Sequence, residues 1–391
     1  MNRVILIVLD GAGAGAAPDA AACCDEGAHT LAHVAESVAG LRVPNLEALG
    51  LGHLDGLAGV RRTGQPDGCF GRMAPLSKGK GSTTGHWELA GIVLEKPFPT
   101  YPDGFPRDII EAFQQAIGRK TLGNFVASGA AVIQEMGVQH LQTGSPIVYT
   151  SSDSVFQVAA HEEVIPVEEL YGMCRAARKL LVPPHQVARV IARPFAGEPG
   201  AFVARTEGRR DFSVEPPAQT LLDVLKAGEY PVVGIGRIEE LFKGRGLTRA
   251  LPARRDAAAV EQILKALQSM PRGLIFANLI DPDVSHEHRD EAAGFARALQ
   301  AFDARLPDII RGMQQDDLLC ITADHGSDPT TPGSGPTREC VPLLVYGARA
   351  AKGVNLGTRK SLADLGQTIA EALGNKHLAW GESFLHVITQ R

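Results

Sequence analysis

The sequence predicts an α/β protein with a mostly parallel sheet flanked by helices, and with a separate α+β domain inserted into it. Two observations lead to this prediction. Short runs of Val, Ile and Leu alternate with amphipathic segments, the pattern of buried parallel strands joined by helices. The runs that would form the sheet lie before about residue 95 and after about residue 220, which leaves a middle block with elements of its own.

The expected core elements follow one another along both ends of the chain. The first strand is the run at residues 3–9; it is too short to span a membrane, ends at Asp10 and lacks the cleavage site of a secretory signal. Four further strands are expected at residues 230–236, 273–280, 317–323 and 341–347, and amphipathic helices at residues 256–270 and 361–374.

The middle block has turn signals rich in Pro and Gly at both edges, residues 95–106 and 212–219. Within it we expect helices at residues 106–118 and 166–181 and strands at residues 145–151 and 186–194. The predicted division is therefore a core of residues 1–96 and 217–391 and an inserted domain of residues 97–216.

The composition is that of an ordinary globular protein. The 391 residues are 44% hydrophobic and 21% charged, which is enough to build two or three cores. The formal net charge of -5 gives no broad basic field, so neither nucleic acid nor an anionic membrane is an expected partner. The six cysteines show no CxxC spacing, which argues against a zinc cluster or a disulfide framework and favours the cytoplasm.

Three predicted core strands end in residues that commonly bind metal ions. Asp10 follows the first strand, Asp281 and Asp283 follow the third, and Asp324 and His325 follow the fourth. Ligands of open α/β sheets bind at the carboxyl ends of the strands, so these groups should converge. Asp and His together suit Mn or Zn, and a pair of such ions can clamp a phosphoryl group. The alternative is that each Asp merely caps a helix or a turn.

A second interpretation applies to the first strand end, where Gly11, Gly13 and Ala16 fit the GxGxxA form of a dinucleotide-binding turn. Asp10 would place a negative charge where a pyrophosphate binds, and Pro18 falls where the helix should continue. An oxidoreductase is therefore not the favoured prediction.

The glycine-rich stretch SKGKGSTTGHWEL, residues 77–89, contains three consecutive hydroxyls at Ser82, Thr83 and Thr84. If it leads into a helix, its backbone N–H groups can face a phosphate and a hydroxyl can act as nucleophile. The alternative is a flexible surface loop with a capping Ser or Thr. A P-loop is not indicated, because no glycine stands five residues before the lysine.

These stretches together resemble the phosphopentomutases, a branch of the alkaline phosphatase superfamily. The similarity covers nearly the whole chain and includes the motifs LDGAGAGAAPDA, HTLAHVAES, GKGSTTGHWELAG, PDGFP, GSPIVYTSSDSVFQVAAHEE, RVIARPFAGEPG, NLIDPDVSHEHRD, TADHGSDPTTPG and TRECVPLL.

The resemblance implies an alkaline-phosphatase-like core, a phosphoryl-carrying nucleophile at Ser82 and a middle block that forms a substrate-binding cap. It implies two divalent ions, with Mn the expected metal. The implied ligands are Asp10, Asp283, His288, Asp324 and His325. By the family's spacing Asp281 lies outside this ligand set.

The resemblance also implies residues that bind the substrate. Arg189 and Arg205 match arginines that hold the non-reacting phosphate, Arg237 takes the place of a family lysine, and Ser151 matches a substrate-contacting position. A guanidinium can hold a phosphate bidentately, although exposed arginines are also common on surfaces without any ligand.

Three positions depart from the family pattern. Gly81 and Ser82 stand where the family has Asp-Thr, and His286-Glu287 stand where it has Tyr-Gly. Eleven residues after His325 the family has a further metal-binding histidine, and here that position is Pro336. We therefore expect the second metal site to be impaired.

The predicted function is the interconversion of ribose or deoxyribose 1-phosphate and 5-phosphate through phospho-Ser82, a cytoplasmic step of nucleoside catabolism with a small sugar phosphate as the expected partner. Two alternatives remain open at this point. A diverged relative could be a phosphatase or mutase for another phosphorylated metabolite, or it could bind a sugar phosphate without turnover.

Overall fold

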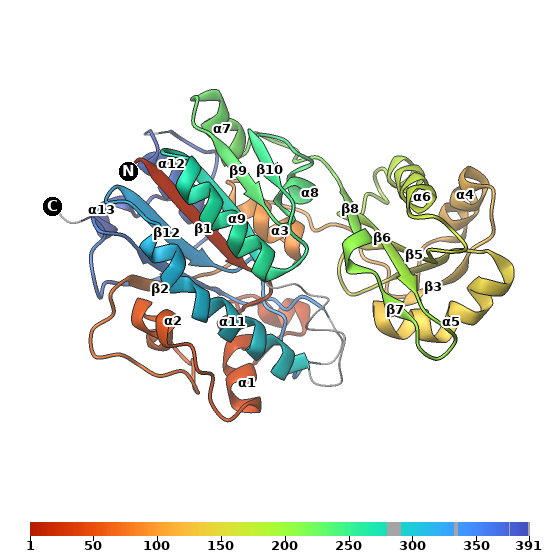
Figure 1. Ribbon diagram of the computed structural model, residues 1–391, viewed down its shortest axis with the longest axis horizontal. Helices are drawn as coiled ribbons and strands as arrows, with labels where there is room; N and C mark the ends of the chain where they lie inside the picture. The colour runs from red at the N-terminus through yellow and green to blue at the C-terminus, as the bar shows by residue number, and fades with distance from the viewer. Residues whose placement is uncertain (280–290, 332–334, 375, 390–391) are drawn as a thin grey trace. The chain divides into compact units, whose positions relative to one another are not determined.

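The computed structural model describes residues 1–279, 291–331, 335–374 and 376–389, and its chain divides into two compact units (Figure 1). The first unit contains Met1–Pro97 and the residues from Pro216 to the C-terminus that cluster with them. The second contains Phe98–Glu215. Each unit has its own sheet and its own buried side chains.

The described part of the first unit has a sheet with the strand order β10-β9-β11-β1-β12-β13-β2-β14. Every neighbouring pair is parallel except those of β13, which runs antiparallel to β12 and β2. The strands, in chain order, are β1 (Arg3–Leu9), β2 (Cys69–Met73), β9 (Val232–Ile235), β10 (Arg249–Leu251), β11 (Gly273–Leu279), β12 (Asp317–Thr322), β13 (Val341–Tyr346) and β14 (Asn355–Arg359).

The central strands β11, β1 and β12 are buried along their whole length. A strand covered on both faces must be apolar at every position, which explains the unbroken runs of Val, Ile and Leu. Their register aligns Leu9 with Leu279 and Val8 with Thr322. The carboxyl ends of these strands therefore lie at one edge of the sheet.

Two groups of helices flank this sheet. Helices α9 and α11 pack on each other, and α1 and α2 contact α11; in Figure 1 the green α9 and the blue-green α11 run in roughly the same diagonal direction. Helix α12 contacts α3, α7 and α13, and α3 contacts α8. Their bounds are α1 (Thr30–Ser37), α2 (Pro44–Leu49), α3 (Ser82–Leu89), α7 (Leu221–Ala227), α8 (Ile238–Phe242), α9 (Asp256–Ser269), α11 (Glu291–Arg311), α12 (Ala363–Ala372) and α13 (Leu385–Ile388), with short 3-10 turns η1 (Ala20–Cys23) and η2 (Leu51–His53).

The second unit has a mixed sheet of order β3-β4-β5-β6-β7, with β8 also pairing with β6. Side chains of β5 alternate between two apolar clusters: Phe156 and Val158 face one cluster and Ala159 faces the other. The elements are β3 (Leu122–Val126), β4 (Ile147–Thr150), β5 (Val155–His161), β6 (Arg189–Ala196), β7 (Val203–Ala204), β8 (Arg210–Ser213), α4 (Arg107–Ile117), α5 (Gly129–Thr143), α6 (Val167–Leu180) and η3 (Thr206–Gly208).

The α/β fold with a mostly parallel sheet flanked by helices, predicted from the sequence, is confirmed. Each strand and helix predicted by its residues is present, with ends shifted by a few residues. Three strands of this sheet were not predicted: β10 at one edge, β14 at the other edge, and β2 next to β14. Among the described helices, none combines the length and the apolarity needed to span a bilayer.

Candidate metal centre

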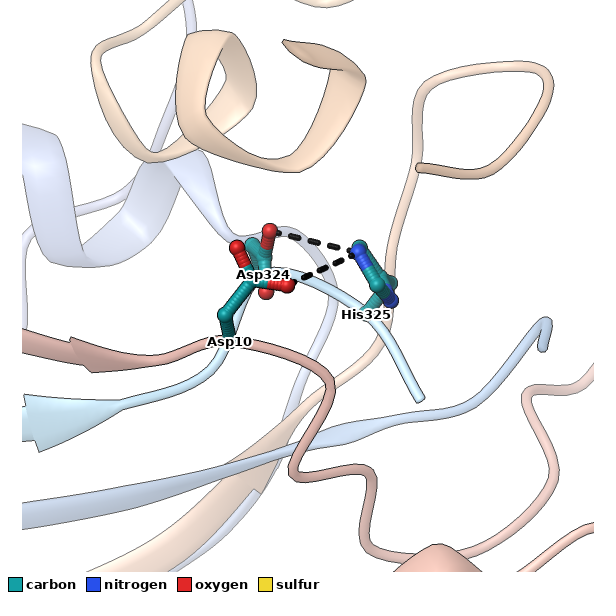
Figure 2. Close-up of side chains that lie close together, drawn as sticks. All are labelled: Asp10, Asp324 and His325. Atoms are coloured by element: carbon teal, nitrogen blue, oxygen red, sulfur yellow. Dashed lines mark ion pairs between the residues drawn. The ribbon is translucent and has the colours of Figure 1, made fainter. Parts of the chain in front are cut away.

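Asp10, Asp324 and His325 form a buried cluster at the carboxyl edge of the sheet, as Figure 2 shows. Asp10 follows β1 and the other two follow β12; because these strands are parallel neighbours in register, their ends deliver the three side chains to one place. The Nε2 atom of His325 lies 3.5 Å from Asp10 Oδ1 and 3.4 Å from Asp324 Oδ2. The predicted convergence of these two strand ends is confirmed.

The donor set of this cluster fits a divalent cation. The Nδ1 atom of His325 lies 2.8 Å from the carbonyl oxygen of Gly326, which can only accept, so Nδ1 carries a hydrogen and Nε2 is the ring atom left to bind a metal ion when the ring is neutral. The buried Oδ2 atom of Asp324 has no hydrogen bond among the described residues. Two carboxylates and one imidazole nitrogen aimed at a common point are suitable ligands for Mn or Zn.

Asp324 is held in its ionised form. Burial opposes ionisation, but the neighbouring His325 and His86 and the backbone N–H of Gly11 outweigh it and keep the pKa of this carboxyl well below its usual value. Gly11 N donates to Asp324 Oδ1 over 3.1 Å. A charged carboxylate is what a metal ligand at this position requires.

Asn278 and His86 contact the two carboxylates of the cluster. The amide nitrogen of Asn278, near the end of β11, donates to Asp10 Oδ2 over 3.1 Å and to His86 Nε2 over 3.3 Å. Nδ1 of His86 donates to the carbonyl oxygen of Ser82 over 2.8 Å and lies 3.2 Å from Asp324 Oδ2. Neither residue was predicted from the sequence, because a single Asn in an apolar strand and a single His in a helix have no spacing signal.

Ser82 is the first residue of α3, and its hydroxyl lies at the cluster. Oγ is 3.3 Å from His325 Nε2 and 3.5 Å from Asp10 Oδ2. The preceding Gly81 has a φ of 115°, a backbone conformation that residues other than glycine rarely adopt. The glycine-rich stretch thus leads into a helix, and the hydroxyl of its first residue points at the candidate metal centre.

Arg237 also lies at this cluster. It precedes α8, is buried, and places Nη1 3.5 Å from Asp10 Oδ2. The described geometry therefore brings together Asp10, Ser82, Arg237, Asp324 and His325 out of the residues predicted from the sequence.

Comparisons with known proteins agree with this geometry. A family model described as the Metalloenzyme superfamily matches residues 2–377. A phosphopentomutase from Dictyoglomus turgidum is 53% identical over 388 residues, covering 99% of this chain and 98% of the relative. One from Dictyoglomus thermophilum is 51% identical and covers 100% and 99% of the two chains; one from Acetivibrio thermocellus is 51% identical and covers 98% and 99%. The chain belongs to the phosphopentomutase family. Membership confirms the family resemblance, the alkaline-phosphatase-like fold and the use of divalent metal.

In this phosphopentomutase-family chain the loop that leads to Ser82 is held from both sides. The buried guanidinium of Arg338 donates to the carbonyl oxygens of Pro75, Ser77 and Gly79 over 2.9, 2.7 and 2.7 Å. The buried carboxylate of Glu88, near the end of α3, accepts from Ser77 N over 2.7 Å. These contacts fix the loop before the helix starts.

Glu339 connects the loops that follow β1 and β12. Its buried carboxylate accepts from the Thr30 hydroxyl over 2.6 Å, from the Thr337 hydroxyl over 2.7 Å and from Gly15 N over 3.2 Å. An added Cβ at Gly13 would lie 2.3 Å from this carboxylate. The residues after Asp10 form turns rather than a helix, so the alternative of a dinucleotide-binding turn has no support in the fold.

The predicted substrate-binding residues of the middle block lie in the second unit. Arg189 is buried and pairs with Asp153 and, over 3.0 Å, with Asp211. Arg205 is half-exposed, with Nε 3.5 Å from a carboxylate oxygen of Glu162. The Ser151 hydroxyl accepts from Asp153 N over 3.4 Å.

The other predicted metal ligands, Asp283 and His288, lie outside the described residues, as do Asp281, His286 and Glu287. Pro336 is described and is partly buried. Its neighbour Thr337 exchanges backbone hydrogen bonds with Gly326, directly after His325. The backbone at the substituted position therefore stays next to the candidate metal centre.

Proposed function

We propose that this protein interconverts ribose or deoxyribose 1-phosphate and 5-phosphate, with Ser82 as the group that carries the phosphoryl in transit. The observation that supports the proposal best is the position of the Ser82 hydroxyl, within 3.5 Å of both His325 and Asp10 at the candidate metal centre. About 50% identity to phosphopentomutases over the full chain supports the same activity.

The chain's own groups prepare Ser82 for transfer. Its hydroxyl donates towards Asp10 Oδ2, which can accept the proton as Oγ attacks. The first residue of a helix lies where unpaired backbone N–H groups favour a phosphoryl group. When bound, a divalent ion lowers the pKa of the hydroxyl and offsets negative charge on the transferred group.

The reaction is an exchange of phosphoryl groups. Phospho-Ser82 gives its phosphoryl to the free hydroxyl of an incoming pentose phosphate: the Oγ–P bond breaks, a bond from sugar oxygen to phosphorus forms, the sugar hydroxyl loses its proton and Ser82 Oγ takes one up. The resulting bisphosphate then returns its other phosphate to Ser82, whose hydroxyl loses its proton, and the sugar oxygen that the phosphate leaves takes one up. The serine ends as it began, and the sugar phosphate is isomerised.

The second unit is proposed to act as the substrate-binding cap. Arg189, Arg205 and Ser151 would hold the phosphate that does not react, because guanidinium groups and hydroxyls are good phosphate donors. The half-exposed Arg205 supports this role most directly, since part of its side chain is accessible to a ligand.

For the metal, we propose one tight site at Asp10, Asp324 and His325, with Mn as the expected ion. A second ion would depend on Asp283 and His288. Proline has no side-chain donor atom, so Pro336 contributes no ligand where family members have a histidine. The second site should therefore be the weaker one.

An assay of the purified protein with ribose 1-phosphate, Mn and a catalytic amount of a pentose bisphosphate tests this function. Formation of ribose 5-phosphate with little free phosphate is the expected result. Release of inorganic phosphate as the main product would instead identify a phosphatase. Binding of ribose 5-phosphate with no turnover would identify a silent sugar-phosphate binder.

A further inference from the structure

Arg237 lies in the first unit, whereas the predicted substrate-binding residues Arg189 and Arg205 lie in the second. It follows β9 and precedes α8, both in the first unit, and its side chain is only 10% exposed. A buried guanidinium must be paired or placed where a negative group arrives, because an isolated charge is costly to bury. Its Nη1 atom lies 3.5 Å from Asp10 Oδ2, a candidate metal ligand.

Arg237 and Ser82 both lie close to the same oxygen atom of Asp10. The Oδ2 atom of Asp10 is 3.5 Å from Arg237 Nη1 and also 3.5 Å from Ser82 Oγ. The guanidinium nitrogen and the serine hydroxyl are therefore no further apart than twice that distance. The non-bridging oxygens of a phosphoryl group on Ser82 lie two bonds from Oγ, so a group directed towards Arg237 brings its oxygens closer to the guanidinium than Oγ itself is.

The chemistry of the two groups is complementary. A guanidinium is always charged and offers a planar set of donors that match two oxygens of one phosphoryl group. At Asp10 the guanidinium also supplies fixed positive charge beside the candidate metal centre.

We propose that Arg237 binds the phosphoryl group that is transferred at Ser82, and not the phosphate that remains on the sugar. The inference rests on the proposed function in so far as Ser82 is the nucleophile. Arg237 makes and breaks no covalent bond; its donors stabilise the charge on the non-bridging oxygens as the group moves between Ser82 and the sugar.

Orthovanadate provides a test that needs no sugar substrate, because it resembles a phosphoryl group on a serine hydroxyl. Its affinity for the Mn-loaded full-length protein is measured by calorimetry in the wild type, Arg237→Met and Arg237→Lys. Arg237→Met should bind orthovanadate about ten- to a hundredfold more weakly, the loss expected for a charge-assisted contact, and Arg237→Lys should recover part of it. Arg245→Met is the matched control: Arg245 pairs with Asp223 in the same unit, and its loss should leave orthovanadate affinity unchanged.

A kinetic measurement separates the two possible phosphates. The rate of Ser82 phosphorylation is followed at increasing concentrations of a sugar bisphosphate. Loss of a contact to the transferred group lowers the maximal rate, whereas loss of a contact to the other phosphate mainly raises the half-saturating concentration. Wild-type orthovanadate affinity in Arg237→Met, together with a raised half-saturating concentration alone, overturns the inference.

The inference and the proposed function can fail separately. Orthovanadate binding that depends on Arg237, in a protein that does not isomerise pentose phosphates, supports the inference and rejects the function. Arg237→Lys keeps the charge and most of the side-chain length, so it reports on the site even if Arg237→Met lowers the melting temperature. If both variants are folded, equal orthovanadate affinity in the wild type, Arg237→Lys and Arg237→Met contradicts the inference.

Discussion

At the residue scale, the amide of Asn278 connects Asp10, a candidate metal ligand, to α3, the helix that begins at Ser82. It donates to Asp10 Oδ2 and to His86 Nε2, and His86 in turn donates to the carbonyl oxygen of Ser82. Groups that orient metal ligands commonly contribute to metal affinity through the ligands they hold.

Asn278→Ala should therefore weaken Mn binding by about ten- to a hundredfold while leaving the ligands in place. Calorimetric titration with Mn measures the effect. Asn355→Ala is a suitable control, because Asn355 is exposed and bonds only locally, to Gly357 N. Equal Mn affinity in Asn278→Ala and the wild type would show that the amide does not orient Asp10.

The sequence indicates the candidate metal ligands more clearly than the residues that support them. Asp10, Asp324 and His325 each follow an apolar strand directly, and the topology of parallel sheets then brings strand ends together. Asn278 lies inside the apolar run itself, and the contact of Arg237 with Asp10 depends on the turn that leads into α8. Such contacts follow from three-dimensional packing, which residue spacing does not encode.

At the element scale, α3 approaches the end of β12 closely because residue 85 is glycine. A Cβ at Gly85 would lie 2.1 Å from the carbonyl oxygen of Asp324, a backbone atom that cannot move aside easily. This close contact brings Ser82, one turn earlier on the same helix, to the candidate metal centre.

Gly85→Ala should push α3 away from Asp324, destabilise the protein by about 1–3 kcal/mol through overpacking and strongly lower the rate of Ser82 phosphorylation. Urea unfolding measures the first effect, and incorporation of phosphate from a sugar bisphosphate measures the second. In Gly64→Ala the added Cβ meets nothing within 4 Å, so both quantities should stay at wild-type values. Normal phosphorylation in Gly85→Ala would mean that the contact does not position the nucleophile.

The core strands that could be predicted from the sequence are those in which every residue is buried. The central strands are covered on both faces and are apolar throughout, so their runs stand out. Strand β14 is largely exposed at the sheet edge and contains no apolar run, and β2 includes a glycine and an arginine. Pairing with neighbours forms these two strands, and local composition does not reveal it.

At the scale of the whole molecule, the first unit is built from both ends of the chain, and the segment between them forms a unit with its own apolar clusters. The residues that converge on the candidate metal centre come from strand ends more than 300 positions apart, Asp10 and Asp324. Folding of the first unit must therefore bring distant segments together before the metal ligands are in place.

Mn titration of the whole protein should reveal one tight site and a second that binds weakly or not at all, because Pro336 offers no ligand. Pro336→His should tighten the second site and raise mutase activity at low Mn concentration. The isosteric comparison is Pro336→Leu, which also lacks a ligand atom and should leave Mn binding as in the wild type. Two equally tight sites in the wild type, without a gain in Pro336→His, would contradict a metal-impaired second site.

The central claim is that Ser82 carries the phosphoryl group, and mapping the phosphorylated residue by mass spectrometry tests it most directly. The Mn-loaded protein is incubated with a sugar bisphosphate, digested, and the peptide containing Ser82, Thr83 and Thr84 is sequenced, with Ser82→Ala treated in parallel. We predict phosphate on Ser82 in the wild type and none on this peptide in a folded Ser82→Ala. Phosphate found only on Thr83 or Thr84 would contradict the account.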